Sequence, residues 1–308
     1  MNLRDLHYIV SLAEQGHYGK AAKACHVSQP TLSGQVAKLE AELGVAIFQK
    51  RGGSVGLTEA GEEIIAHARK ALTAAHDITE AARAHKDPLN GRLRLGIIPT
   101  LSPYLMPYVL PLAAEKLPGA PLALIENLTA NLIPLVGEGK LDTALIATAD
   151  FPPDLASIEL FDEDFWVVTP SNHPLLARKS VRPSDIDPAN LLLLTDGHCL
   201  RDQTLELCGQ SNAAGANTAD MRAASLETLL NLTAAGYGIT LAPQLAIECG
   251  RTNLEQLAFR PLEGAGARRR VRLIYRRNSP RAKALIELAR IVTDALPAGV
   301  QRLANAPG

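Results

Sequence analysis

Residues 21–48 read AAKACHVSQPTLSGQVAKLEAELGVAIF and decide the fold of the N-terminal region. Apolar residues recur at helical spacing over residues 32–43, and Gly44 closes that pattern. Ser28 stands where a helix takes its N-cap, since its hydroxyl can accept a hydrogen bond from an unpaired backbone N–H. A shorter apolar pattern at residues 19–25 precedes it across a tight turn. Two short helices joined in this way predict a helix-turn-helix.

The flanking residues extend this motif on both sides. An apolar pattern at residues 3–13 predicts a first helix that ends near Gly16. After the helix-turn-helix, two short segments separated by two glycines predict a two-stranded wing, in which Lys50 and Arg51 are positioned for phosphate. Residues 1–58 hold six Lys/Arg against four Asp/Glu, so bulk charge would contribute little and DNA affinity would depend on several copies of the chain.

The second helix of the predicted motif begins with small polar side chains, which suit a helix that reads base edges in the major groove of DNA. The predicted DNA-binding residues of this helix and its cap are Ser28, Gln29, Pro30, Thr31, Ser33, Gln35 and Lys38. A solvated polar helix face is the simpler interpretation of the same residues. The basic wing beside them favours DNA binding.

A long helix is predicted over residues 59–87. Thr58 is its predicted cap, and glutamates follow in the first turns, where the helix dipole favours anions. Its apolar stripe consists of Ile64, Ala68, Ala71, Leu72, Ala75, Ile78 and Ala82. A single helix cannot bury so long a stripe, which predicts pairing with a second copy of the chain. The turn-forming residues DPLNG at 87–91 then mark a linker.

The remaining chain, residues 88–308, alternates between strand and helix patterns, which predicts an α/β domain with a mostly parallel sheet. The expected lobes, on either side of a cleft, are residues 88–163 with 267–308 and residues 164–266. The run LLLL at residues 191–194 suits a buried strand of the second lobe. Six arginines between residues 268 and 277 flank another buried strand, and a second nucleic-acid site is not expected there.

The chain as a whole has the composition of an ordinary soluble protein. Its 308 residues are 47% hydrophobic and 20% charged, with a net charge of −1. No stretch approaches the ~20 apolar residues of a membrane span, and the early charges of the N-terminus do not fit a secretory signal. We therefore expect a cytoplasmic protein without membrane contact, in which a static structural disulfide would be unusual.

Two of the four cysteines, Cys199 and Cys208, lie nine positions apart in the segment GHCLRDQTLELC at residues 197–208. This spacing fits no common metal-ligand pattern, and neither a metal nor another cofactor is expected. A predicted cap at Asp196 places Cys199 in the first turn of a helix, where the helix dipole stabilises a thiolate. The other cysteines, for which no role is expected, are Cys25 and Cys249.

Helix geometry makes the pair informative. Nine residues of helix place the Cys199 and Cys208 side chains on opposite sides and their Cα atoms about 13 Å apart. A disulfide needs less than about 7 Å, so its formation would require the helix to unwind. Neighbouring His198 and Arg201 would stabilise a Cys199 thiolate further. Two buried, inert thiols remain the simpler interpretation of the spacing alone.

These segments resemble the LysR-type transcriptional regulators over the whole chain. The resemblance rests on AAKACHVSQPTLSGQVAKLEAELGVAIF, the wing, LTEAG at residues 57–61 and the long helix. Further along, RLRLGIIPTLSPYL, GKLD, GHCLRDQ, SLETL and AAGYGITLAP are similar to the peroxide-sensing members of that family. The resemblance implies a winged helix-turn-helix, a linker helix and a two-lobed regulatory domain like a periplasmic binding protein.

For peroxide-sensing members, the resemblance further implies that the Cys199 thiolate attacks hydrogen peroxide and that Cys208 then closes an intramolecular disulfide. The peroxide pocket carried over from these members consists of Thr100, Thr129, Gly197, His198 and Arg201. Helix N-caps are the simpler structural role of Thr100 and Thr129. The two roles are compatible.

The same resemblance implies a DNA-bound regulator of the bacterial cytoplasm rather than an enzyme. Its expected partners are double-stranded operator DNA, RNA polymerase, a thiol reductant such as glutaredoxin or thioredoxin, and further copies of the chain, as dimers through the long helix and as tetramers. Two other interpretations stay open. A LysR-type regulator would bind a small metabolite in its cleft, with incidental cysteines. A thiol peroxidase would leave the first 87 residues unexplained.

Overall fold

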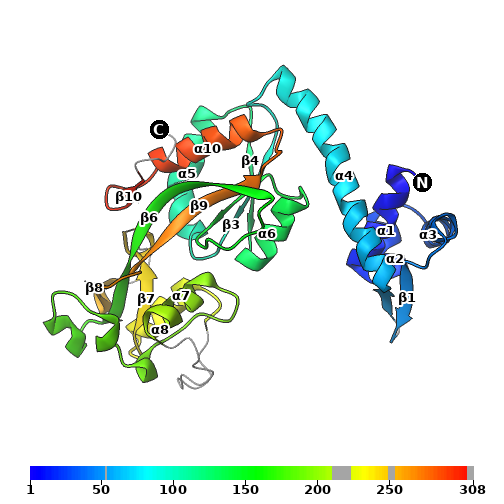
Figure 1. Ribbon diagram of the computed structural model, residues 1–308. Helices are drawn as coiled ribbons and strands as arrows, with labels where there is room; N and C mark the ends of the chain where they lie inside the picture. The colour runs from blue at the N-terminus through cyan, green and yellow to red at the C-terminus, as the bar shows by residue number, and fades with distance from the viewer. Residues whose placement is uncertain (53, 210–222, 249–253, 304–308) are drawn as a thin grey trace. The chain divides into compact units, whose positions relative to one another are not determined.

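The computed structural model describes residues 1–52, 54–209, 223–248 and 254–303. The chain divides into two compact units, Met1–Ala82 and Arg83–Gly308 (Figure 1). Within the described ranges, no helix is both long and apolar enough to span a lipid bilayer.

The first unit contains the predicted winged helix-turn-helix. Its elements are α1 (Leu3–Gln15), α2 (Tyr18–Ala24), α3 (Gln29–Leu43), β1 (Phe48–Arg51) and β2 (Ser54–Leu57). Ser28 caps α3, and Gly16 and Gly44 end α1 and α3 in the left-handed conformation. These helix ends agree with the prediction because residues close in sequence determine them.

A small buried core joins the three helices to the wing. Leu12 of α1 and Leu32 of α3 are fully buried in it. The Glu40 carboxylate of α3 accepts backbone hydrogen bonds from Ile47 at 2.7 Å and Phe48 at 3.1 Å. The start of the wing is therefore held by the same helix whose leading end carries the predicted DNA-binding residues.

The long helix α4 (Glu59–Lys86) follows the wing. The Thr58 hydroxyl caps it by accepting a hydrogen bond from the Gly61 N–H at 2.9 Å, as predicted. The apolar stripe divides into two parts: Ala68 and Leu72 pack against the core of the first unit, whereas Ile78 is 73% exposed. The first part of the stripe thus needs no second copy of the chain, and only its later part presents apolar surface.

The second unit is built on a mixed sheet with strand order β10-β6-β9-β5-β3-β4. These strands are β3 (Leu93–Ile97), β4 (Leu122–Glu126), β5 (Thr143–Ile146), β6 (Leu155–Pro170), β9 (Arg268–Arg276) and β10 (Gln301–Arg302). Strand β3 runs parallel to β4 and β5, but β5–β9, β9–β6 and β6–β10 are antiparallel pairs. The prediction of a mostly parallel sheet is wrong, because the long strands β6 and β9 pair with each other in opposite directions.

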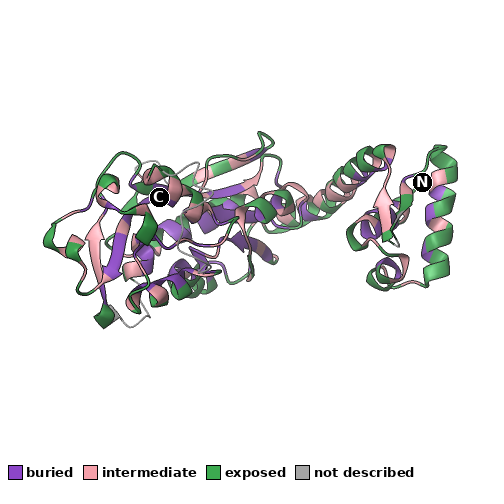
Figure 2. Cartoon of the chain, turned by 90° about the horizontal axis from the view of Figure 1, so that it is seen from below, coloured by how far each residue is buried: buried purple, intermediate pink, exposed green. Residues whose placement is uncertain are grey.

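Helices cover this sheet: α5 (Ser102–Lys116), α6 (Thr129–Gly137) and α10 (Ala282–Asp294). The central strands β3 and β5 are buried (Figure 2), whereas the edge strands β4 and β10 are partly exposed. Leu95 and Ile97 of β3 are fully inaccessible to solvent. Between these two residues, a side chain at Gly96 would meet Leu132 of α6 and Leu141 at 2.7 Å. The close approach of α6 to β3 therefore requires glycine here, and it brings the start of α6 to the carboxyl end of the strands.

Strand β6 continues beyond this sheet and pairs with two further strands. The elements of this second part are α7 (Cys199–Leu207), α8 (Leu226–Ala234), β7 (Thr240–Pro243), α9 (Gln244–Glu248) and β8 (Leu257–Pro261). Residues 191–194 do not form the predicted strand. Leu191 bridges to Ile239 and Leu194 to Ala223, so successive residues pair with two different segments and no continuous ladder forms.

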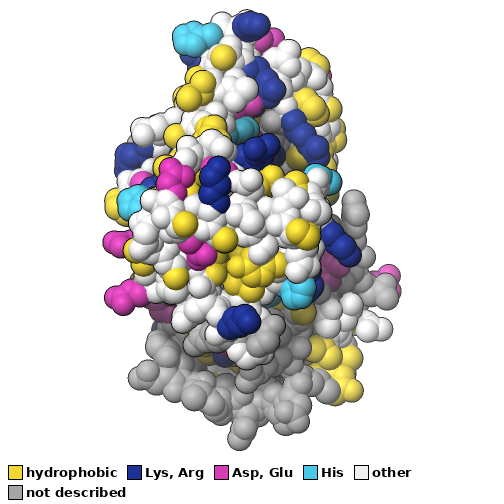
Figure 3. Space-filling view, turned by 90° about the vertical axis from the view of Figure 1, so that its right-hand side faces the viewer, with side chains coloured by type: hydrophobic (Ala, Val, Ile, Leu, Met, Phe, Trp, Pro, Cys, Tyr) yellow, Lys and Arg dark blue, Asp and Glu magenta, His cyan; other side chains and the backbone are white. Residues whose placement is uncertain are grey.

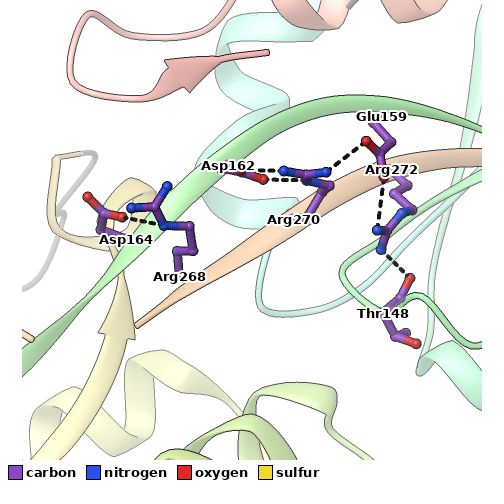
Figure 4. Close-up of polar contacts among 7 residues, drawn as sticks. All are labelled: Thr148, Glu159, Asp162, Asp164, Arg268, Arg270 and Arg272. Carbon is purple, nitrogen blue, oxygen red and sulfur yellow. Dashed lines mark hydrogen bonds and ion pairs between the residues drawn. The ribbon is translucent and has the colours of Figure 1, made fainter. Parts of the chain in front are cut away.

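The arginines at the start of β9 alternate between the two faces of the strand. Those on the outer face pair with carboxylates of β6 (Figure 4): Arg268 with Asp164 at 3.7 Å, Arg270 with Asp162 at 2.7 Å and with Glu159 at 2.8 Å, and Arg272 with Glu159 at 3.0 Å. Arg269 lies on the inner face and pairs with Glu163 at 2.7 Å. Carboxylates of the same chain thus compensate these four arginines.

Candidate redox site

The segment before α7 turns sharply at Gly197, whose φ of 93° is one that other residues rarely adopt. A side chain there would also meet Leu128 at 3.0 Å. Glycine therefore allows the chain to pass close to the start of α6 before α7 begins.

Asp196 does not cap α7. The cap position is His198, whose side chain makes no capping hydrogen bond. Asp196 instead accepts a hydrogen bond from the Arg201 Nε at 2.8 Å. The predicted Asp196 cap is wrong because this guanidinium holds the carboxylate outside the helix.

Cys199 is the first residue of α7, and Cys208 directly follows its last. Both are free thiols, as is Cys25, whereas Cys249 lies outside the described residues. A regular helix separates the two Cα atoms by about 13 Å, too far for a disulfide. The structure is therefore the reduced form, and Cys208 packs against the core of the second unit.

Cys199 borders a small hollow that, in this structure, is too narrow to admit a water molecule. Its lining residues are Ile98, Pro99, Thr100, Leu128, Thr129, Gly197, His198 and Cys199. Four of the five predicted pocket residues are thus brought together around the thiol. Arg201 does not line the hollow, because its guanidinium is held by Asp196.

The two threonines are not helix caps. Leu101 and Leu128 occupy the cap positions of α5 and α6, and neither makes a side-chain capping bond. The Thr100 hydroxyl accepts a hydrogen bond from Arg269 Nη1 at 2.9 Å. Within the described part of the chain, the buried Thr129 hydroxyl has no partner at full hydrogen-bond geometry. The N-cap interpretation is therefore wrong, and both hydroxyls belong to the thiol hollow.

Arg269 is a member of the site that the sequence analysis missed. It is 2% exposed, and it donates from Nη1 to the Thr100 hydroxyl and from Nη2 to the Thr100 carbonyl at 3.1 Å. A signal for it exists in the sequence, because strand alternation places Arg269 on the same face as the buried Val271 and Leu273. A buried arginine needs a carboxylate partner, and Glu163 supplies it.

Opposing effects act on the Cys199 thiol. Burial raises its pKa above the ordinary value and is the largest effect. The Arg269 charge lowers this pKa, and the nearby Thr129 hydroxyl and the Leu200 N–H lower it further, whereas Asp202 raises it. The thiol is therefore mostly protonated at neutral pH, but it lies among groups that stabilise a thiolate once it forms.

His198 lines the hollow as predicted. It is 6% exposed, and burial lowers its pKa from the ordinary value of 6.5. The imidazole is therefore neutral at pH 7, so any stabilisation of a Cys199 thiolate by His198 comes from its N–H rather than from a positive charge. A neutral imidazole still offers one hydrogen-bond donor and one acceptor to a molecule in the hollow.

A larger cleft of about 410 Å³ adjoins the thiol hollow. Its lining residues are Pro99, Pro103, Tyr104, Glu126, Asn127, Leu128, His198, Ala224, Ser225, Leu226 and Glu227. A small metabolite would have room there. No group of three or more His, Cys, Asp or Glu among the residues with described positions is arranged to hold a metal ion.

The predicted DNA-binding residues lie at the surface of the first unit. Exposed are Ser28, Gln29, Pro30, Thr31, Ser33, Lys38 and Lys50, and half-buried is Gln35. The side chain of Arg51 lies outside the described residues. On the face shown in Figure 3, Lys and Arg side chains are scattered among apolar and acidic ones.

Comparison with models of protein families shows which family the chain belongs to. The model of the bacterial regulatory helix-turn-helix protein, lysR family, matches residues 3–62, and that of the LysR substrate binding domain matches residues 86–296. The chain belongs to the LysR family. Both of its units thus have counterparts in this family, and α4 spans the whole segment between the matched regions.

Within the LysR family, similar proteins include the "Hydrogen peroxide-inducible genes activator" of Dickeya chrysanthemi, 38% identical over 98% of both chains. A full-length OxyR of Pseudomonas aeruginosa with a cysteine-to-aspartate substitution has a TM-score of 0.77 at 36% identity and covers 100% of this chain and 99% of its own. A peroxide-bound cysteine-to-serine variant of Corynebacterium glutamicum OxyR has a TM-score of 0.63 at 38% identity, over 96% and 92%. The chain is thus similar to OxyR proteins along nearly its whole length.

Proposed function

We propose that the chain is a transcriptional regulator that binds promoter DNA and senses hydrogen peroxide through Cys199 and Cys208. The observation that carries this proposal is the placement of the two thiols at opposite ends of one helix, with Cys199 beside a small hollow lined in part by Thr100 and Thr129. The similarity to OxyR proteins supports it. The chain belongs to the same family as these proteins and has both thiols free in the reduced form.

The first chemical step joins the Cys199 sulfur to one peroxide oxygen. As the S–O bond forms, the O–O bond breaks, and the departing hydroxide takes up a proton and leaves as water. The hollow has to widen to admit hydrogen peroxide; the Thr100 and Thr129 hydroxyls that line it then hydrogen-bond the peroxide oxygens, and the Arg269 charge stabilises the developing negative charge. The product is a sulfenic acid on Cys199.

In the second step the Cys208 thiol attacks the sulfenic sulfur. The S–S bond forms, and the sulfenic hydroxyl leaves with the thiol proton as water. Because helix geometry keeps the two residues too far apart, α7 has to unwind before they meet. Leu200 and Thr204, which are buried in the reduced form, then lose their present packing. The disulfide thus replaces one arrangement of this segment by another, as a two-state switch requires.

The switch acts on DNA through assembly of the chain. The chain forms dimers through the later part of α4 and tetramers through the second unit, and it contacts RNA polymerase at activated promoters. A glutaredoxin or thioredoxin returns the disulfide to two thiols and resets the regulator. The protein works in the bacterial cytoplasm, bound to DNA. Peroxide changes its DNA contacts and is not turned over as a substrate.

Two alternatives make different predictions. A regulator that responds to a metabolite would use the larger cleft and would be indifferent to loss of Cys199. A thiol peroxidase would consume many peroxide molecules per chain in the presence of a reductant. The winged helix-turn-helix would then have no function in the reaction. Slow peroxide consumption together with peroxide-dependent DNA contacts favours the sensor.

A footprint on a bound promoter fragment, recorded before and after peroxide treatment, tests this function. The wild-type chain should protect different positions in its reduced and oxidised forms. Cys199→Ser should bind DNA with one footprint under both conditions, because the attacking sulfur is gone. Cys208→Ser should also fail to reach the oxidised footprint. A peroxide-dependent change that survives in Cys208→Ser would show that the disulfide step is wrong.

A further inference from the structure

Glu163 lies on β6, next to the thiol site but outside the hollow. Its Oε1 accepts a hydrogen bond from Arg269 Nε at 2.7 Å and lies 2.7 Å from Nη2. Its Oε2 accepts from the Leu245 N–H of α9 at 3.2 Å. Both side chains of the ion pair are 0% exposed. These contacts join the Glu163 carboxylate to β9 and α9 and hold it in place beside the sheet.

The far side of the same guanidinium faces the redox site. While Glu163 holds Nε and Nη2, Nη1 donates to the Thr100 hydroxyl at 2.9 Å and Nη2 to the Thr100 carbonyl at 3.1 Å. A planar guanidinium held on two sides has little freedom to rotate. The orientation of the Thr100 hydroxyl and the position of the positive charge near the Cys199 sulfur thus depend on the same ion pair.

We propose that Glu163 is a positioning residue for the reaction of Cys199 with peroxide: it holds Arg269 against Thr100, so that the hydroxyl and the guanidinium face the sulfur. This inference rests on the proposed function, since it concerns the same reaction. Glu163 touches neither the thiol nor the hollow and acts through Arg269.

A second position is available to the Arg269 side chain. On another side of the residue lies a hollow of about 460 Å³, whose lining includes Arg269, Gln203 and the exposed Glu206. Arg268 and Arg270 also line it, but their charges are compensated by Asp164 and Asp162. A buried guanidinium without a compensating carboxylate is unstable. Without the Glu163 charge, Arg269 is therefore expected to turn into this hollow, towards water and the Glu206 carboxylate, and to leave Thr100.

The experiment measures how fast Cys199 reacts with hydrogen peroxide in the reduced full-length chain. Samples are quenched with an alkylating agent, and the Cys199 peptide is quantified by mass spectrometry at a series of pH values. Glu163→Gln should slow the reaction at pH 7 about tenfold and shift the pH profile by about one unit to higher pH, since one unit of thiol pKa changes the thiolate fraction tenfold. Glu163→Asp sets the carboxylate back by about 1.5 Å and should give a smaller slowing in the same direction.

A double-mutant cycle separates positioning from any independent role of Glu163. Arg269→Met and the double variant Glu163→Gln/Arg269→Met should react at the same rate, because Glu163 has no effect when Arg269 is absent. The matched control is Asp162→Asn, which removes the neighbouring carboxylate that pairs with Arg270 on the opposite face of β6. This control should keep the wild-type rate and pH profile.

Several outcomes would overturn the inference. One is a folded Glu163→Gln chain with the wild-type rate and pH profile, and another is additive effects in the cycle. If circular dichroism shows that Glu163→Gln does not fold, Glu163→Asp decides, and a wild-type rate in that variant contradicts the inference. A wild-type chain whose Cys199 does not react with peroxide would contradict the proposed function itself, which is a distinguishable result.

Discussion

The residue that carries the proposed chemistry, Cys199, is held between opposing influences. Burial disfavours its thiolate, and Arg269 with the Thr129 hydroxyl favours it. A thiol of this kind is mostly protonated at rest and reacts through the small thiolate fraction, which grows as pH rises towards its pKa. Reactivity is thus set by groups from three segments, α6, α7 and β9, that meet only in the folded chain.

His198 gives the reduced form a pH dependence on the acid side. Its pKa is lowered in the folded chain, so the folded chain disfavours protonation relative to the unfolded chain. The stability this provides is fully present above pH 6.5 and is lost as pH falls through the lowered pKa. We expect the melting temperature to fall below pH 6.5 in the wild-type chain and to fall less in His198→Asn. Thermal unfolding followed by circular dichroism measures this.

His173 provides the comparison for this prediction. Burial lowers its pKa as well, and its Nδ1 accepts a hydrogen bond from the Leu175 N–H away from the thiol site. His173→Asn should remove a separate part of the acid destabilisation and leave the part due to His198. For a domain of this size, a loss of about 1 kcal/mol lowers the melting temperature by about 2–4 °C, which is measurable. Identical pH dependence in wild type and His198→Asn would contradict the prediction.

At the scale of secondary structure, α7 is the element that has to change. Its reduced conformation is fastened to the first sheet by Gln203, whose Nε2 donates to the Ala147 carbonyl at 2.8 Å. The oxidised chain cannot keep α7 intact and is expected to lose this bond. Loss of the bond in a variant therefore destabilises the dithiol relative to the disulfide.

Gln203→Ala should make the reduction potential of the Cys199–Cys208 pair more negative. One hydrogen bond contributes about 1 kcal/mol, which corresponds to about 20 mV for a two-electron couple. Equilibration in glutathione buffers, with the disulfide fraction read by mass spectrometry, measures the potential. Glu206→Ala on the exposed side of the same helix corrects for the helix propensity of alanine. Equal potentials in the two variants would show that the Gln203 bond does not hold the reduced form.

The exposed part of α4 is the second element with a prediction. Ile78 is 73% exposed, and burying one isoleucine at an interface contributes about 1.5–3 kcal/mol. If α4 pairs with a second copy there, Ile78→Glu should weaken dimerisation at least about tenfold. Sedimentation equilibrium of the full chain measures this, with the exposed His76→Glu on the opposite side of α4 as the control. An unchanged association constant in Ile78→Glu would exclude this interface.

The elements also show what a sequence can and cannot predict. The ends of α1 and α3 follow from Ser28, Gly16 and Gly44, because caps involve residues that are close in sequence. A helix with Cys199 in its first turn was predicted, but it starts two residues later than a cap at Asp196 would place it, because a guanidinium holds the Asp196 carboxylate in the folded chain. The distance between residues along the sequence does not show that the Arg201 guanidinium and the backbone N–H groups of α7 compete for the Asp196 carboxylate.

The thiol site was only partly predictable for a related reason. The resemblance to the family carried over Thr100 and Thr129 to the hollow, where they lie. Arg269 is 70 positions from Cys199 and is one of six similar arginines, so neither proximity nor residue type distinguishes it. Only the alternation along β9, together with the pairing of β9 and β6, turns it towards Glu163.

At the scale of the whole molecule, β6 connects the two sheets of the second unit and β9 runs beside it. Cys199 lies on a helix of one part, whereas Thr100 and Thr129 precede or begin helices of the other. Arg269 and Glu163 lie on the connecting strands themselves. A change in α7 therefore breaks contacts between the two parts, which is how a reaction at one sulfur can alter the shape that the unit presents to its partners.

Disulfide mapping of the intact chain after brief exposure to hydrogen peroxide tests the central claim most directly. At low micromolar peroxide, we expect the intact mass to fall by the mass of two hydrogens. After digestion, we expect a disulfide-linked pair of peptides that joins Cys199 to Cys208. Cys25 and Cys249 should remain reduced under the same conditions. A chain that stays fully reduced, or that forms its first disulfide between other cysteines, would contradict the account.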